Sequence, residues 1–511
     1  MKQALLIYPT EISEIPHSLA LIAAILKEEG YRVDTIISTF KKPLTNDDFV
    51  AKARDVRPDL VGISMMTMQC LKVYDLIRRL KAMGLFVVVG GAHATDCPEE
   101  VVGHGADIAV RNEGEESIRE IVHRKPLQDI LGISYAVGLE PLRMIATNPP
   151  RPRLKDLTTL PNPDFSVFDL PLFELPGDGL IKGINRVYSS RGCPGKCTYC
   201  DWQVFGQKVS YHPVPELITE IQRRVDEYGI TNFMIADDCF TTNRKHVEAF
   251  CEAIVNVRPK IIWQTSTRAD FAEIGMMRMM AQAGCYMVSI GIESGDEETL
   301  RRIKKGVKLE DNYNAPVICA EAGLQVITNL MFGFPWETVA HLENTHRLIK
   351  AIWAATYMFQ VSGAVIPFPG SQIYREFAEE YGFKDYWLKE KYQGCGVQLY
   401  QNALKPYAVS TFYHRNMYDD TYIAEDYFFK YPEAYKEKLW EVISDTGRHN
   451  LEMTFPGRPF KQAMVMNLCK LSRWAYKRWP HLEKGIGGMI ESRRRPPAED
   501  TRNVKKGIIK H

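Results

Sequence analysis

The chain of 511 residues carries 64 Lys and Arg against 63 Asp and Glu, so its net charge is +1. This balance gives no global attraction to nucleic acid or to an anionic membrane, and we expect no nucleic acid partner. Hydrophobic residues make up 45% of the chain, which is enough for substantial cores. No apolar run reaches the roughly 18 residues of a spanning helix, so we expect no transmembrane segment. The first residues read as a strand and not as a signal peptide.

The first 140 residues alternate between strand and helix patterns. Short apolar strands are predicted at residues 4–7, 32–37, 60–64, 86–89 and 108–110, with helices at 19–29, at 71–83 and up to residue 122. Strands as apolar as these are buried on both faces. The pattern therefore predicts an α/β domain over residues 1–140, a doubly wound parallel sheet with helices on each side.

Ligands of such sheets bind beyond the carboxyl ends of the strands. The small and polar residues of the first domain gather in those loops: Pro9, Thr10, Ser64, Met65, Thr67, Gln69, Gly90, Gly91, His93, Glu113, Gly114 and Glu115. Glycines let a large ligand lie close to the backbone, and hydroxyl groups supply hydrogen bonds. A doubly wound domain that binds no such ligand also carries glycines after its strands, so these loops alone do not name the ligand.

Residues 141–185 are dense in proline, including Pro149, Pro150, Pro152, Pro161 and Pro163. Proline interrupts both helices and central strands. The composition therefore predicts a linker between two domains.

Alternation resumes over residues 186–375 with longer helices. Strands are predicted at residues 187–190, 232–236, 261–266, 286–292, 325–332 and 360–366, separated by helices such as 215–228 and 244–256. Six strand–helix units predict a partial (β/α)6 barrel that is open on one side. Its active groups are expected on the loops that follow the strands.

Cys193, Cys197 and Cys200 follow the first of these strands, with the spacing C-x3-C-x2-C. A [4Fe-4S] cluster takes four ligands, so three Cys leave one iron open to another molecule. A structural zinc site takes four Cys or His ligands, usually as two close pairs, and the chain has no second C-x2-C pair. Eleven Cys in total are too few and odd in number for a disulfide framework, and the other eight read as small core residues.

Residues 376–511 are rich in Tyr, Phe and Trp and show helical patterns at 432–442 and 460–477. We expect a small α-helical domain there, and no specific motif is recognisable in it. Aromatic residues at such spacing are more often core than ligand contacts. If this domain covers the open side of the barrel, it contributes to a substrate pocket.

The cysteine spacing, with the aromatic Tyr199 before the third Cys, resembles the radical S-adenosylmethionine (SAM) enzymes. The loops G-G-x-H at Gly90 and E-G-E at Glu113 resemble the cobalamin-binding domain that precedes the barrel in the B12-dependent members. The segments G-I-E-S-G, G-F-P-x-E-T and P-F-P-G-S also resemble that family, in order, so the resemblance covers residues 1 to about 375. It implies three cofactors, a [4Fe-4S] cluster, SAM and cobalamin.

The resemblance also implies which residues contact each cofactor. The three cysteines hold the cluster, and SAM fills the fourth position. The loops of the first domain listed above would contact cobalamin. The polar strand ends of the barrel would contact SAM: Tyr199, Asp237, Asp238, Ser266, Arg268, Glu293, Ser294, Gly333, Pro335 and Pro367.

One feature departs from the family pattern. Proteins that bind cobalt through a His carry Asp-x-His-x-x-Gly after the first strand, and here His17 lacks that context. We therefore expect no protein His on cobalt. His93 is expected to contact the corrin ring or its tail, although a lone loop His is more often solvated.

The function implied is methylation of an unactivated carbon, in which one SAM yields a 5′-deoxyadenosyl radical and methylcobalamin supplies the methyl group. The runner-up is an oxidative cyclisation or rearrangement of a tetrapyrrole, lipid or natural-product intermediate. A non-catalytic cobalamin-binding protein is the third class. An electron donor such as flavodoxin or ferredoxin and a cytoplasmic location are expected, whereas the sequence does not name the small-molecule, lipid or tetrapyrrole substrate.

Overall fold

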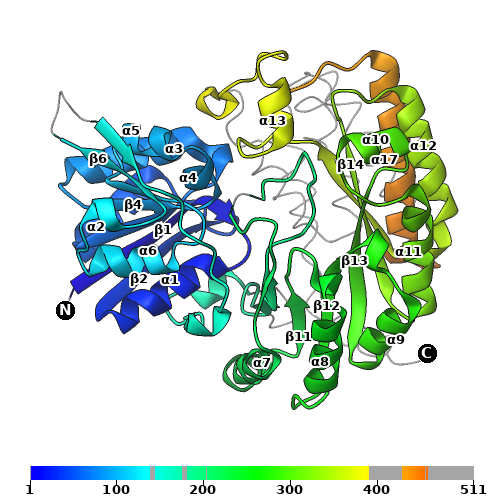
Figure 1. The fold of residues 1–511 in the computed structure, drawn as a ribbon, viewed down its shortest axis with the longest axis horizontal. Helices are drawn as coiled ribbons and strands as arrows, with labels where there is room; N and C mark the ends of the chain where they lie inside the picture. Colours follow the sequence, from blue (N-terminus) through cyan, green and yellow to red (C-terminus); the bar gives the residue numbers. More distant parts are fainter. Residues whose placement is uncertain are drawn as a thin grey trace.

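The computed structural model describes residues 2–138, 144–174, 181–202, 204–390, 428–454, 456 and 457. Two α/β domains lie side by side, the first in blue and cyan and the second in green and yellow (Figure 1). The first contains a seven-stranded sheet and the second a six-stranded sheet. The predicted doubly wound domain followed by a partial barrel is confirmed.

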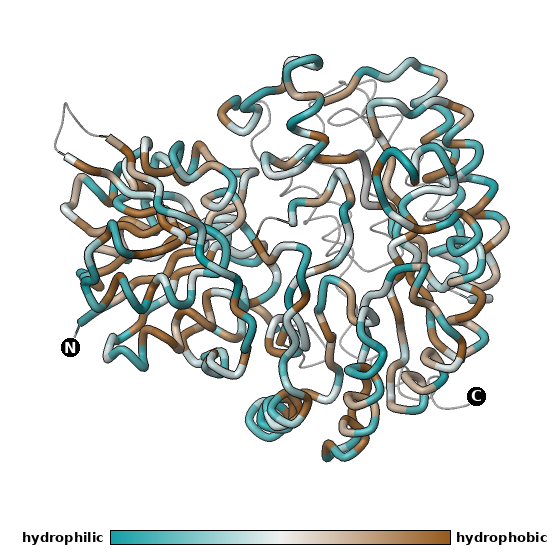
Figure 2. The backbone as a smooth tube through the Cα atoms, in the orientation of Figure 1, coloured by the Kyte–Doolittle hydropathy of each residue, from teal (hydrophilic) through white to brown (hydrophobic). Residues whose placement is uncertain are grey.

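The first sheet has the spatial order β2-β1-β3-β4-β5-β6-β7. Its strands are β1 Lys2–Ile12, β2 Tyr31–Thr39, β3 Leu60–Ser64, β4 Val87–Gly90, β5 Ile108–Val110, β6 Ile133–Val137 and β7 Met144–Thr147. Strands β1 to β5 pair in parallel, as predicted. Figure 2 shows hydrophobic residues concentrated along these strands, inside the domain.

Strands β6 and β7 pair antiparallel at one edge of this sheet and were not predicted. In β7, Met144 and Ile145 are exposed, so the strand lacks the apolar alternation that marks a half-buried strand. Because β7 belongs to the first sheet, that sheet extends beyond residue 140 into the segment that composition identified as a linker.

The helices of the first domain follow its parallel strands in sequence. They are α1 His17–Glu28, α2 Asn46–Val56, α3 Cys70–Ala82, α4 Ala92–Asp96, α5 Pro98–Gly103 and α6 Glu115–Val122. Helix α1 packs with α6, and α2 packs with α3. This arrangement places the loops after β1, β3, β4 and β5 at the same edge of the sheet, as parallel pairing requires.

The proline-rich segment after β7 is attached to the first domain. The Asp164 amide donates to the Ala20 carbonyl at 3.0 Å, and the Lys41 ammonium donates to the Glu174 carbonyl at 2.6 Å. The segment forms the 3-10 turns η3 Leu157–Thr159 and η4 Leu170–Leu172. It therefore forms a wall between the two domains.

The barrel sheet is parallel throughout, in the order β15-β14-β13-β12-β11-β8. Its strands are β8 Arg186–Val187, β11 Asn232–Ile235, β12 Ile262–Arg268, β13 Cys285–Glu293, β14 Gln325–Phe332 and β15 Met358–Ala364. The covering helices are α7 Val214–Tyr228, α8 Arg244–Ile254, α9 Ile274–Gln282, α10 Glu297–Arg302, α11 Leu309–Glu321 and α12 Val339–Ala351. Six parallel strands without closure match the predicted open barrel.

Beyond β15 the chain forms α13 Gln372–Phe377, the 3-10 turn η8 Tyr386–Leu388 and the long helix α17 Glu433–Thr454. Helix α17, drawn in orange, packs against α12 and β15 (Figure 1). The helix expected at 432–442 is therefore present and longer. The helix expected at 460–477 and most of the aromatic region lie outside the described residues.

Candidate functional site

The cysteine loop is framed by the two-stranded sheet of β9 Ser190–Arg191 and β10 Ser210–Tyr211. Gly192 begins the loop with φ +98, and a Cβ there would lie 2.5 Å from the Lys208 carbonyl oxygen. Only glycine fits such a position. The Thr198 amide donates to the Ile303 carbonyl at 2.9 Å, which attaches the loop to the barrel.

The cysteine thiols converge on one side of the loop. A Cβ at Gly195 would lie 3.3 Å from the Cys193 Sγ and 3.7 Å from the Cys197 Sγ. Burial, then the charges of Cys197 and Cys193, raise the pKa of Cys200 to about 12. Three thiolates this close repel one another unless a cation lies between them, so the three cysteines fit a metal cluster.

Asp237 and Asp238 follow β11 and hold the start of the loop. The Asp237 carboxylate accepts hydrogen bonds from the amides and hydroxyls of Ser189 and Ser190, at 2.5 to 3.1 Å. Asp238 Oδ2 accepts from the Gly192 amide at 3.2 Å. Both oxygens of Asp237 are thus used in hydrogen bonds within the protein. Asp238, in contrast, also faces the cavity described below.

Two cations lie near the cysteines, the half-buried Arg268 and the buried Lys305. Arg268 pairs with Asp270 at 3.0 Å, and its guanidinium lies 3.3 Å from the position of a Cβ on Gly195. Lys305, which the sequence patterns did not indicate, pairs with Glu293 at 2.8 Å, and its ammonium lies 3.5 Å from the Tyr199 hydroxyl. Glu293 therefore already has a cationic partner.

The remaining residues predicted for SAM occupy different environments. Ser294 is fully buried and bonds with the Thr345 hydroxyl at 3.1 Å, so its role is within the protein. Gly333 follows β14, Pro335 is half-buried two residues later, and Pro367 is buried after β15. Ser266 lies on β12, opposite Ser289 of β13.

The loop at Gly333 is held by a buried cluster that includes α17. The Glu337 carboxylate accepts from the Gly333 amide at 2.6 Å, from the Phe334 amide at 3.1 Å and from the Tyr435 hydroxyl at 2.8 Å. The Tyr431 hydroxyl donates to the Gly333 carbonyl. Tyr435 in the first turn of α17 and Tyr431, two residues before the helix begins, thus fix both backbone groups of Gly333.

This cluster predicts a pH-dependent stability. Burial raises the pKa of Glu337 from an ordinary 4.5 to about 7. The folded protein therefore binds this proton more tightly than the unfolded chain does, so the contribution is complete below pH 4.5 and is lost as the pH rises through 7. We expect a loss on the order of 3 kcal/mol across that window. Urea unfolding at pH 5 and pH 8 measures it, and a Glu337→Gln variant that keeps the same pH dependence would contradict the assignment.

A cavity of about 940 Å³ lies between the two domains. The first domain lines it with the ends of β3, β4 and β5 and with residues 14–19. The segment before the barrel contributes residues 157, 158 and 160–163. The barrel contributes Tyr188, Ser190, Arg191, Phe205 and Asp238 among others. One space therefore touches both the glycine loops and the strand that leads into the cysteine loop.

The cavity separates the residues predicted for cobalamin into two groups. Those on its wall are Ser64, Gly90, Gly91, Glu113, Gly114 and Glu115. Those that do not line it are Pro9, Thr10, Met65, Thr67, Gln69 and His93. In the loop after β3, Met66 faces the cavity, whereas its neighbours Met65 and Thr67 are buried behind it. Alternation along an extended segment explains this division.

His93 is not at the cavity wall, which corrects its expected place against the corrin. Its ring is fully buried, 3.0 Å from the Tyr74 hydroxyl, 3.3 Å from the Thr67 hydroxyl and 3.3 Å from the Cys70 thiol. The Trp387 ring packs edge-on against it. His93 thus joins the first domain to the turn η8.

His17 does line the cavity, beside the Tyr188 ring at a centroid distance of 4.6 Å. Burial, then the charges of Arg224 and Arg191, hold the pKa of His17 well below its usual range. The ring is therefore neutral at pH 7. His17, which was not expected to bind cobalt, therefore lies at the wall of the cavity.

The size and lining of the cavity fit a large flat ligand. Its volume is at the upper end for small-molecule sites. Gly62 lines it from the middle of β3, and a Cβ there would lie 2.7 Å from a methyl carbon of Leu6. With glycine at positions 62, 90 and 91, a ligand can approach the backbone closely along this wall.

Comparisons with known proteins agree with this geometry. A family model described as B12 binding domain matches residues 12–122, and one described as Radical SAM superfamily matches residues 187–349. The chain is 30% identical over 391 residues to an uncharacterized methyltransferase, PH0819, of Pyrococcus horikoshii, which covers 73% of this chain and 82% of the relative. The chain belongs to the cobalamin-dependent radical SAM family.

Members of this family with other named activities are also similar to the chain. The anaerobic magnesium-protoporphyrin IX monomethyl ester cyclase of Rubrivivax gelatinosus is 24% identical, over 74% of this chain and 68% of the relative. The solved structure of the cobalamin-dependent SAM radical enzyme OxsB, with aqua-cobalamin and SAM bound, has a TM-score of 0.66 at 15% identity. It covers 99% of this chain and 83% of that structure, so the two proteins share a fold.

As a member of the cobalamin-dependent radical SAM family, the protein is an enzyme whose cofactors are a [4Fe-4S] cluster, SAM and cobalamin. The predicted family and cofactors are confirmed. Among the described residues, no helix is both long and apolar enough to cross a bilayer.

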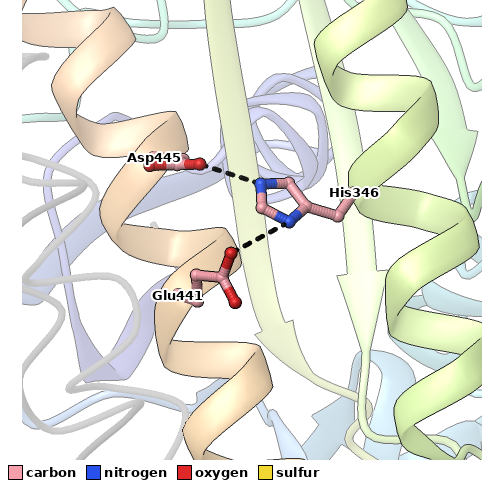
Figure 3. A group of neighbouring side chains, drawn as sticks. All are labelled: His346, Glu441 and Asp445. Carbon is pink, nitrogen blue, oxygen red and sulfur yellow. Dashed lines mark hydrogen bonds and ion pairs between the residues drawn. The ribbon is translucent and has the colours of Figure 1, made fainter.

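His346, Glu441 and Asp445 form a further cluster where α12 meets α17 (Figure 3). These side chains are of kinds that bind metal ions. The buried imidazole, however, already has a carboxylate at each nitrogen, Asp445 at 2.9 Å and Glu441 at 3.6 Å. The Lys438 ammonium lies 2.9 Å from Glu441 and supplies positive charge. We assign the cluster to the attachment of α17.

Proposed function

We propose that this enzyme methylates an unactivated carbon of a small-molecule substrate. The observation that carries the proposal is the single cavity that reaches from Gly90 and Gly91 of the first domain to Ser190 and Asp238 of the barrel. A methyl donor held on the first side would lie next to the loop that holds the cluster. When bound, the cluster, SAM and cobalamin supply the electron, the radical and the methyl group.

In this proposal the residues of the chain position the cofactors and exclude water. Cys193, Cys197 and Cys200 hold the cluster. Lys305 and Arg268 place positive charge beside these cysteines, where the carboxylate of SAM would be attracted. We also propose contacts from Tyr199 and from the loops at Gly333 and Pro367 to SAM.

In the first domain, the proposed cobalamin contacts come from the cavity wall. They include Ser64, Gly90, Gly91 and Gly114, together with Met66 of the loop after β3. Since the loop that contains His17 lacks the pattern Asp-x-His-x-x-Gly, we propose that cobalt carries no protein His. The described part of the C-terminal region holds the Gly333 loop, and we propose that this region also borders the substrate.

The proposed setting is a reducing cytoplasm with a flavodoxin or ferredoxin as the electron donor. The nine cysteines among the described residues are all free thiols, which accords with a reducing compartment. An oxygen-sensitive cluster in the same protein supports the same setting.

Methyl-deuterated SAM tests the proposed function. With the true substrate, we expect a labelled product together with 5′-deoxyadenosine and S-adenosylhomocysteine in about equal amounts. One SAM supplies the radical and a second restores the methyl group on cobalamin. The mass of the product and the amounts of the two nucleosides are measured.

The alternative is a cyclisation, favoured by the similarity to the protoporphyrin ester cyclase. A cyclase would release 5′-deoxyadenosine without transferring label and without matching S-adenosylhomocysteine. Unlabelled product beside ample 5′-deoxyadenosine would therefore replace methylation with this alternative.

A further inference from the structure

The carboxylates of the E-G-E loop face the barrel. Glu113 Oε1 accepts from the Arg191 guanidinium at 3.0 Å, and Glu115 Oε1 lies 2.8 Å from the other terminal nitrogen of the same guanidinium. The three side chains are 7 to 10% exposed. Both carboxylates of a loop expected to contact cobalamin therefore form ion pairs with one residue of the second domain, Arg191.

Arg191 lies two residues before the first cluster cysteine. It ends β9, and Gly192 then turns the chain toward Cys193 in a conformation that only glycine adopts comfortably. The guanidinium also lies over the Phe205 ring, 5.3 Å from its centroid. Few rotatable bonds thus separate the fixed guanidinium from the cluster ligands.

The segment between the domains reinforces this contact. Glu113 Oε2 accepts from the Leu154 amide at 2.8 Å, and the Arg153 guanidinium donates to the Arg191 carbonyl at 3.1 Å. The E-G-E loop, the linking segment and the cysteine loop are therefore joined through Arg191. All three carboxylate and guanidinium groups border the interdomain cavity.

We propose that Arg191 is a positioning residue that, through Glu113 and Glu115, fixes the cysteine loop relative to the cobalamin side of the cavity. A guanidinium shared by two carboxylates has a fixed orientation, which a single ion pair does not impose. The bridge holds constant the separation between the methyl-donating and the radical-forming sides of the site. The inference rests on the bound cofactors of the family and holds whether the substrate is methylated or cyclised.

The test uses the reconstituted holoenzyme, with hydroxocobalamin as the probe and no substrate. Removing only Arg191 would take the nearest cation away from two buried carboxylates, although Arg153 lies 3.9 Å from Glu113, and would endanger folding. The informative variant is therefore the neutral triple replacement Arg191→Met, Glu113→Gln and Glu115→Gln. Arg191→Lys keeps the charge but loses the planar fork, and the exposed pair Arg244 and Glu273, changed to Gln, serves as the control.

The readout is pulsed EPR of reduced cobalamin, whose spin relaxes faster when the reduced cluster is held nearby. In the triple variant we expect full cluster content but a broadened, weaker relaxation enhancement and about tenfold weaker cobalamin binding or more. Arg191→Lys is expected to be intermediate, and the Arg244 control to match wild type.

Wild-type relaxation enhancement in the triple variant would overturn the proposal. Loss of the cluster in Arg191→Lys would also overturn it, since Arg191 would then serve the folding of the cysteine loop. Neither readout depends on substrate, so both are separate from the test of methylation.

Discussion

Protein in which Cys193, Cys197 and Cys200 are all changed to Ala is expected to bind no [4Fe-4S] cluster after anaerobic reconstitution. Wild type is expected to bind about four irons and four sulfides, because three thiolates converge on one side of the loop and hold the cluster directly. Iron and sulfide analysis, charge-transfer absorption and the EPR signal of the reduced state measure the difference. In wild type, that EPR signal should change when SAM is added.

A matched control removes two buried thiols that lie on helices outside the cysteine loop. Cys251 and Cys319 are buried in α8 and α11, and their joint replacement by Ala should leave the cluster unchanged. A cluster signal that survives in the triple Ala variant would move the metal site elsewhere and would remove the central claim.

Gly91→Ala is expected to have the second large effect, on the first domain and on cobalamin binding. Gly91 has φ +103 and ψ −178, a backbone conformation that is almost confined to glycine. A Cβ there would lie 2.7 Å from the Met65 carbonyl oxygen and 2.9 Å from the Met65 amide nitrogen. Strain and overpacking together cost about 2–6 kcal/mol of stability. Denaturant unfolding and titration with hydroxocobalamin measure the two effects.

Gly84→Ala separates strain from close contact. Gly84 has φ +77, and a Cβ there would have no atom within 4 Å. We expect a cost of about 1–2 kcal/mol and unchanged cobalamin binding. Equal losses of stability and of cobalamin binding in the two variants would show that the Met65 contact is not what requires glycine at position 91.

The features that were predictable from sequence are those encoded within a few residues. The cysteine loop, the G-G turn after β4 and the apolar strands each carry their chemistry in a local pattern. Strand β7 was not predicted, because Met144–Thr147 is a short, exposed edge strand in which apolar and polar residues do not alternate.

The partners of the site residues were not predictable, since they come from distant segments. Arg191 and Glu113 are 78 residues apart, and Tyr435 and Glu337 are 98 apart. The burial of His93 depends on Trp387, which the chain brings back from beyond the barrel. The sequence alone located the polar loops. It did not reveal which of their side chains form hydrogen bonds and ion pairs within the protein and so are not available to a ligand.

The hydrogen bonds from Tyr431 and Tyr435 to Gly333 determine where the enzyme can be shortened or fused to another protein. The recognisable sequence motifs of the family end near residue 375, which makes that point attractive for a minimal fragment or a fusion to another C-terminal region. A chain cut there lacks Tyr431 and Tyr435 and leaves the buried Glu337 carboxyl without its hydroxyl donor. When the C-terminal regions of two relatives are exchanged, the loop after β14 must therefore be exchanged together with those regions.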